Sequence, residues 1–129
     1  MPFQKGLLAA SAAGEVLLGV GLLTWPRQLV ALLLGELPPD GGVLIARCLG
    51  VAVLGLGLAW WFAKGSPRGC RVSAPGYLVY NLGVGATIAL YALSGAGIVV
   101  LLWPIAILHL ALGLAFALVQ VGFRPTARR

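Results

Sequence analysis

Long apolar stretches alternate with short polar ones along this chain, and four of the apolar stretches are long enough to cross a membrane. They cover residues 5–24, 43–63, 77–94 and 97–121. A spanning helix needs about 20 apolar residues, because each residue advances the helix by about 1.5 Å and the hydrocarbon core is about 30 Å thick. The pattern therefore predicts an all-α fold, a single domain over residues 1–129 that forms an integral membrane antiparallel four-helix bundle.

The segment between the first two stretches has a different pattern. Pro26 stands where a helix can begin, apolar residues continue through Leu34, and Gly35 and Pro38-Pro39 then interrupt the run. Since this run is too short to span a bilayer, it predicts a short interfacial helix on the membrane surface. The sequence "SGAG" at 94–97 predicts a tight turn, which makes the third and fourth spans antiparallel neighbours.

The composition agrees with a lipid environment. Of the 129 residues, 60% are hydrophobic and 9% are charged, whereas soluble domains carry about 25% charged residues. The net charge of +6 does not indicate nucleic acid, because the basic residues lie at the ends of apolar runs rather than in one patch. At those ends they indicate membrane topology and contacts with anionic lipid.

The basic residues also predict an orientation. Of the nine Lys and Arg residues, Arg27 precedes the second span, Arg47 lies within it, and the others fall on the opposite side. Those others are Lys5, Lys64, Arg68, Arg71, Arg124, Arg128 and Arg129. Since cytoplasmic segments are rich in Lys and Arg, we expect both termini and a polar loop at 65–75 to be cytoplasmic. Aromatic residues would form the interfacial belts, with Trp25 and Tyr91 outside and Trp60, Trp61, Tyr77 and Phe123 inside.

Four polar residues interrupt the apolar spans, namely Glu15, Arg47, Asn81 and His109. Ionisable groups in lipid cost about 2.5–3.5 kcal/mol each, so they normally face the bundle interior and pair. Counted by helix rise from the cytoplasmic face, Glu15 lies about 15 Å up, His109 about 18–20 Å, Arg47 about 24 Å and Asn81 only about 6 Å. The sequence therefore predicts an intramembrane polar cluster of Glu15, Arg47 and His109, with Asn81 as a separate, secondary polar site.

Each member of this predicted cluster has more than one candidate role. In the first alternative, Glu15 has only a packing role and is either protonated or paired with Arg47. In the second, it is a carboxylate that binds a proton or a cation. Arg47 either extends to the outer interface or pairs with Glu15, an anionic ligand or lipid. His109 either hydrogen-bonds to Glu15 or another helix, or carries a pigment or haem shared with another subunit, because the chain offers one His and only Met1 as axial ligands.

Small residues repeat every four positions in several spans. Gly6, Ala10 and Gly14 do so in the first, and Ala46 and Gly50 do so in the second. Such faces let helix backbones approach closely. We expect these small residues to pack mainly against helices of the same chain. They are numerous enough to form a subunit interface as well.

Two family resemblances bear on function. The first helix ending in "TWP", "ARCLGVAVLGLGLAWW" in the second and "WPIAILH" in the fourth resemble uncharacterised small four-helix bacterial inner-membrane proteins of the DoxX-like kind. "AAGEVLLG" at 12–19 resembles the small multidrug resistance transporters, and this resemblance implies that Glu15 exchanges a proton for a cationic drug. Unlike that family, the chain has a long first loop, no tryptophan in its third span and a strong Lys/Arg bias.

Recognisable catalytic patterns are missing from the sequence. It contains no phosphate-binding loop with a lysine, no His-Glu-x-x-His, no paired acids and no specific Ser/His/Asp set. We therefore expect no catalytic residues and no metal, and a non-enzymatic subunit or accessory protein in a homo-oligomer or a larger membrane complex. The alternative function is a small proton-coupled transporter that uses Glu15, with His109 and Arg47 tuning it.

Overall fold

The computed structural model describes residues 2–94 and 100–122, and this part of the chain forms five α-helices. They are α1 (Pro2–Thr24), α2 (Pro26–Leu34), α3 (Asp40–Ala63), α4 (Pro67–Leu93) and α5 (Leu102–Gly122). α1, α3, α4 and α5 are each long and apolar enough to cross a membrane, as expected of a multi-pass membrane protein. The predicted all-α class and the four candidate spans are confirmed. Most of the "SGAG" turn, the start of the fourth predicted span, Phe123 and the basic tail lie outside the described residues.

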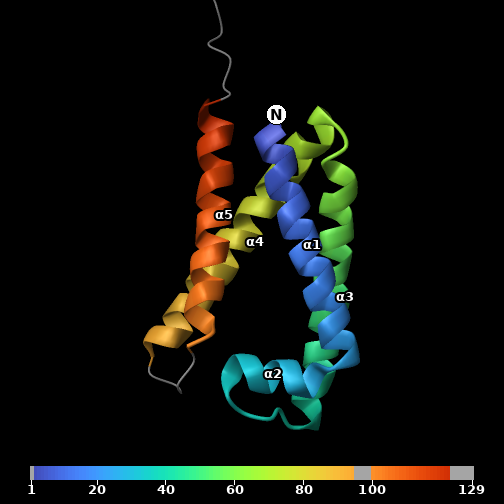
Figure 1. The fold of residues 1–129 in the computed structure, drawn as a ribbon, viewed down its shortest axis with the longest axis vertical. Coiled ribbons are helices and arrows are strands. Elements are labelled where there is room, and N and C mark those ends of the chain that lie inside the picture. Colours follow the sequence, from blue (N-terminus) through green and yellow to red (C-terminus); the bar gives the residue numbers. More distant parts are fainter. Residues whose placement is uncertain (1, 95–99, 123–129) are drawn as a thin grey trace, which may run out of the picture.

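The four long helices form two antiparallel pairs (Figure 1). α1 packs along α3, and α4 packs along α5, whereas contacts between the two pairs are much sparser. The pairs approach each other at the end where α1 begins and where α3 passes into α4. They diverge towards the other end, where α2 lies crosswise. The described helices therefore form two antiparallel pairs that splay apart at one end, and the predicted four-helix bundle in a membrane stays a prediction.

Glycines bring α1 and α3 into backbone contact. A Cβ added to Gly50 would lie 3.0 Å from the Gly19 carbonyl oxygen, and one added to Gly57 would lie 3.0 Å from the Ala12 carbonyl oxygen. Larger side chains at these positions would push the helices apart. Among the predicted small-residue positions, Gly50 therefore lies in the contact between α1 and α3.

The other predicted packing face, Gly6, Ala10 and Gly14, lies outside the contact between the helices. All three residues are exposed, and a Cβ added to Gly6 or Gly14 would have nothing within 4 Å. The buried positions of α1 are spaced by three and four residues along a different line of the helix, which includes Leu8, Ala12, Glu15, Gly19 and Leu22. Because neighbouring residues differ by about 100° around a helix, a repeat of four small residues does not by itself specify which face is buried.

α4 begins ten residues earlier than the predicted third span, so the segment expected as a loop at 65–75 is largely helical. Ser66 caps the helix, since its hydroxyl accepts a hydrogen bond from the Gly69 amide at 3.0 Å. Pro67 occupies the first turn, where its missing N–H is not needed, and the helix continues through Pro75. Asn81 consequently lies fourteen residues into its helix, which places it about 21 Å from the start instead of the expected 6 Å.

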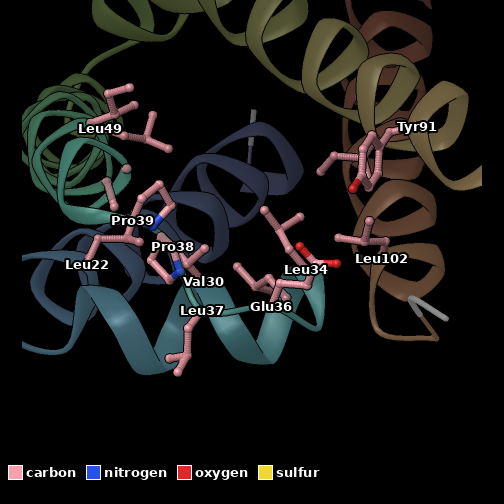
Figure 2. A pocket seen from close by; sticks show the side chains of 15 residues that line it. Leu22, Val30, Leu34, Glu36, Leu37, Pro38, Pro39, Leu49, Tyr91 and Leu102 are labelled. Carbon is pink, nitrogen blue, oxygen red and sulfur yellow. The ribbon is translucent and has the colours of Figure 1, made fainter. Parts of the chain in front are cut away.

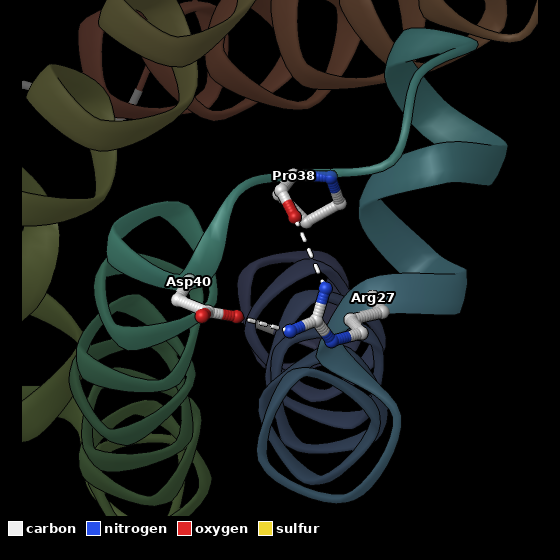
Figure 3. A network of polar contacts seen from close by, with 3 residues as sticks. All are labelled: Arg27, Pro38 and Asp40. Atoms are coloured by element: carbon white, nitrogen blue, oxygen red, sulfur yellow. Dashed lines mark hydrogen bonds and ion pairs between the residues drawn. The ribbon is translucent and has the colours of Figure 1, made fainter.

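α2 forms where the sequence predicts a short helix, although its place on a membrane surface stays a prediction. It begins at Pro26 and ends at Gly35, whose φ of +79° is readily adopted by glycine. Arg27 anchors it to the start of α3, because its guanidinium forms an ion pair with Asp40 and donates a hydrogen bond to the Pro38 carbonyl at 3.3 Å (Figure 3). α2 is thereby held close to α3 at the open end of the molecule.

Candidate functional site

Buried polar side chains from both helix pairs meet between the pairs. Glu15 on α1 is only 5% exposed, and the Tyr80 hydroxyl on α4 donates a hydrogen bond to its Oε2 atom at 2.7 Å. Ser11, one turn before Glu15, shares a hydrogen bond of 2.7 Å with the Tyr77 hydroxyl. Two hydrogen bonds therefore connect α1 to α4 across a region otherwise made of apolar side chains.

Asn81 and His109 extend this cluster to α5. Asn81 is fully buried, and its Nδ2 atom donates to the Tyr77 carbonyl at 3.0 Å. Its Oδ1 atom lies 3.1 Å from His109 Nδ1. Since a carbonyl oxygen only accepts, His109 carries its proton on Nδ1 and donates it to Asn81. Nε2 is then the ring nitrogen left to accept a hydrogen bond or to ligate a group.

Aromatic rings surround these hydrogen bonds. The Tyr77 ring centroid lies 4.5 Å from Phe116 and 4.8 Å from Trp60. The Tyr80 ring packs edge-on against Trp60 at 5.3 Å and against His109 at 5.6 Å. Trp60 and Tyr77, predicted for the inner interfacial belt, are instead buried at the contact between the helix pairs. Their hydrophobic bulk and tilted packing hold the pairs together here.

The cluster brings together three of the four predicted polar residues. Glu15 and His109 do not bond to each other, because Tyr80 lies between them, bonded to Glu15 and packed against the His109 ring. Asn81, expected apart, is His109's partner. Arg47 is exposed on α3, and its side chain makes no hydrogen bond or ion pair within residues 2–94 and 100–122.

Ser11, Tyr77 and Tyr80 were not among the predicted site residues. The available signal was their spacing, since Ser11 and Glu15 are four residues apart and Tyr77, Tyr80 and Asn81 follow at three and four. Residues with this spacing share one face of a helix. Two polar faces on different spans thus indicate where the spans meet.

A pocket of about 760 Å³ lies between the helix pairs near the open end (Figure 2). Its walls are mainly apolar and come from all five helices and the loop that follows α2. Leu22, Ile88 and Leu102 each line it seven or eight residues along their helices from Glu15, Tyr80 and His109 respectively. The pocket therefore lies about 10–12 Å from the polar cluster, towards α2. Glu15 does not line it.

The described residues offer no evident metal site. No group of three or more His, Cys, Asp or Glu side chains within residues 2–94 and 100–122 is arranged to hold a metal ion. Cys48 is exposed and Cys70 is buried, and neither forms a disulfide. A pigment or haem is one alternative role of His109, for which Nε2 would be the ligating atom.

Comparison of the chain with protein-family models, with curated proteins and with solved structures found no match. The two family resemblances therefore stay predictions, and the function is argued from the geometry.

Proposed function

We propose that this chain is a small polytopic membrane protein that acts as a non-enzymatic subunit or accessory protein of a membrane complex. The observation that supports this best is the exposed face of α1 formed by Gly6, Ala10 and Gly14. Packing within the chain uses Ala12 and Gly19 instead, which leaves the exposed face open. In a membrane, such a face lets the backbone of another helix approach closely, whether from a second copy or from a larger protein.

The buried polar groups support the same proposal because they bond mainly to one another. Among the described residues, Gln120 Nε2 is the only buried side-chain nitrogen or oxygen atom without a hydrogen-bond partner. Polar side chains that satisfy each other in this way hold helices together in lipid. The Lys/Arg bias favours both termini in the cytoplasm, and the DoxX-like resemblance implies a bacterial inner membrane.

The test is to block the exposed face of α1 without disturbing the fold. Gly14→Leu places a large side chain on this face, and Gly83→Leu is the matched control, because Gly83 on α4 is equally exposed with equally open space. Protein from native membranes, in gentle detergent, would be weighed by native mass spectrometry. We expect a second copy or another membrane protein to accompany the wild-type chain and the control. Gly14→Leu should weaken this association about tenfold, equivalent to about 1.4 kcal/mol. A wild-type monomer with no companion would contradict the proposal.

One observation favours the alternative function, a small proton-coupled transporter. The bond from Tyr80 to Glu15 joins the two helix pairs, so protonation of Glu15 would act on the contact that holds the pairs together. Movement of one helix pair against another is a common form of alternating access. The resemblance of "AAGEVLLG" to the small multidrug resistance transporters points to the same residue.

Glu15→Gln distinguishes the two functions. Glutamine keeps an oxygen that accepts the Tyr80 hydrogen bond but carries no ionisable proton. If the chain is a transporter, Glu15→Gln should abolish pH-driven uptake of lipophilic cations into proteoliposomes, and His109→Gln should alter it less. If uptake were equal for the wild-type chain, Glu15→Gln and empty vesicles, the transporter function would be excluded.

A further inference from the structure

The pocket between the helix pairs has the character of a lipid-chain site. Its volume of about 760 Å³ falls within the range of about 300–1,000 Å³ that is typical of small-molecule sites. Its side walls come from helices that are apolar enough to span a membrane, so lipid chains would surround these helices in a bilayer. Aliphatic side chains such as Leu22, Ile45 and Leu49 line it. An aliphatic chain is the group that such walls would hold.

Two polar side chains line the pocket and distinguish it from a plain apolar gap. The Glu36 carboxylate and the Tyr91 hydroxyl are both directed into the space between α2 and the α4–α5 pair (Figure 2). Glu36 follows the end of α2 in the connection to α3, whereas Tyr91 lies in the last turn of α4. A carboxylate and a hydroxyl thus face the part of the pocket where a ligand's polar head would lie.

The charges at this end favour a cationic head group. Arg27 is engaged by Asp40, and within the described residues Glu36 has no ion-pair partner. Arg47 follows Ile45 by two residues and precedes Leu49 by two, so it lies about 200° around α3 from each of these pocket residues. The pocket therefore has one unpaired carboxylate and no facing cation, an arrangement that disfavours anionic head groups and favours an ammonium group.

We propose that the space between the two helix pairs binds one acyl chain of a bilayer phospholipid that has a primary ammonium head group, as in phosphatidylethanolamine. The acyl chain lies between Leu22, Leu49 and Ile88. The ammonium group pairs with the Glu36 carboxylate, and the Tyr91 hydroxyl donates a hydrogen bond to the phosphate. α2 and the loop after it cover the lipid on the side away from the polar cluster. This ligand site goes beyond the proposed role as a subunit and does not depend on the α1 face.

Photo-crosslinking in nanodiscs of defined composition tests this proposal. The full chain is placed in equal parts of phosphatidylethanolamine, phosphatidylcholine and phosphatidylglycerol, and one lipid at a time carries a diazirine near the end of an acyl chain. We expect the ethanolamine lipid to label Ile45, Leu49 and Ile88 about two- to fivefold more than the choline lipid, as suits one solvent-accessible ion pair. Equal labelling by the two lipids at these positions, or an excess of the glycerol lipid, would overturn the proposal.

Two pairs of variants separate the role of the lipid's acyl chain from that of its head group. Leu49→Trp fills the pocket and should reduce labelling of Ile88 severalfold, whereas Leu44→Trp, at another exposed α3 position that does not line the pocket, should not. Glu36→Gln should remove the excess of ethanolamine over choline lipid without lowering the choline signal, and Glu36→Asp should keep that excess. Circular dichroism confirms that each variant is helical. Equal labelling of Ile88 in Leu49→Trp and Leu44→Trp would overturn the proposal. So would cross-links in native membranes that join the pocket to a protein in place of lipid.

Discussion

Tyr80 is the side chain that determines the surroundings of Glu15. The carboxyl group is almost fully buried, and within the described residues the Tyr80 hydroxyl is its hydrogen-bond partner. A buried polar group that loses its partner costs about 1–3 kcal/mol, whereas hydrogen bonds between membrane helices average nearer 0.6 kcal/mol, because the unfolded chain in lipid finds other partners. The Tyr80 hydroxyl therefore contributes to the stability of this contact, beside the Ser11–Tyr77 hydrogen bond and the aromatic packing.

Replacing that hydroxyl should loosen the contact between the helix pairs. Tyr80→Phe keeps the ring against Trp60 and His109 but leaves Glu15 without its donor, so we expect the free energy of unfolding to fall by about 1–2 kcal/mol. Titration of mixed micelles with a denaturing detergent, followed by circular dichroism, measures the change. Tyr91→Phe is the control, since Tyr91 is 41% exposed and its hydroxyl has no hydrogen-bond partner among the described residues. Equal stabilities of the two variants would show that the Glu15 bond contributes nothing.

Gly19 shows how the packing of two helices depends on one backbone position. A Cβ at Gly19 would come within 2.8 Å of the Gly50 carbonyl oxygen and of the Leu54 backbone nitrogen. These are backbone atoms of α3, which cannot rotate away as the end of a flexible side chain can. Gly14, five residues earlier in the same helix, has open space around it. The two glycines therefore have opposite expected responses to the same substitution.

Alanine at these two positions tests the α1–α3 contact. Alanine favours the helix over glycine by about 1 kcal/mol, so Gly14→Ala should leave the free energy of unfolding unchanged or raise it by up to about 1 kcal/mol. Gly19→Ala should lower it by about 1–2 kcal/mol, because overpacking outweighs the gain in helix propensity. The same detergent titration compares them. If Gly19→Ala were as stable as Gly14→Ala, the close approach of α1 to α3 at this point would be refuted.

The arrangement of the described helices places α2 and the connection between α3 and α4 at opposite ends of the four long helices. If the four long helices cross a bilayer, residues in these two segments face opposite aqueous compartments. Gln28 on α2 and Arg68 at the start of α4 are both exposed, and their side chains make no hydrogen bond within the described part of the chain. They are therefore suitable positions for probes of topology.

Single cysteines at these positions, in a chain with Cys48→Ser and Cys70→Ser, report the topology. In sealed inside-out and right-side-out vesicles, a membrane-impermeant maleimide should label Gln28→Cys and Arg68→Cys from opposite sides. The Lys/Arg bias predicts the cytoplasmic side for Arg68→Cys. Labelling of both positions from one side would contradict the arrangement, and labelling of Arg68→Cys from the outer side would reverse the predicted orientation.

Much of the fold could be read from particular residues before the structure was known. Pro26 and Gly35 mark the two ends of α2, as their backbone preferences require. The start of α4 was missed because Pro75, two glycines and two arginines within 65–75 resemble a loop, although Ser66-Pro67 is a capping signal. That error displaced Asn81 along its helix, so its pairing with His109 was not foreseen.

The amino-acid sequence alone predicts the lipid environment and gives the four candidate spans, because so few charged residues cannot cover the apolar surface of this chain in water. It also decides which residues are unusual in lipid, since Glu15, Asn81 and His109 stand out in any apolar run. Only the tertiary structure decides which of them meet. One residue turns a helix by about 100°, so small changes in where helices begin and how they pack determine that Glu15 faces Tyr80 and that Arg47 faces outwards. The pocket has the same origin, since bulky aromatic residues hold the two helix pairs together at one end and the pairs diverge at the other.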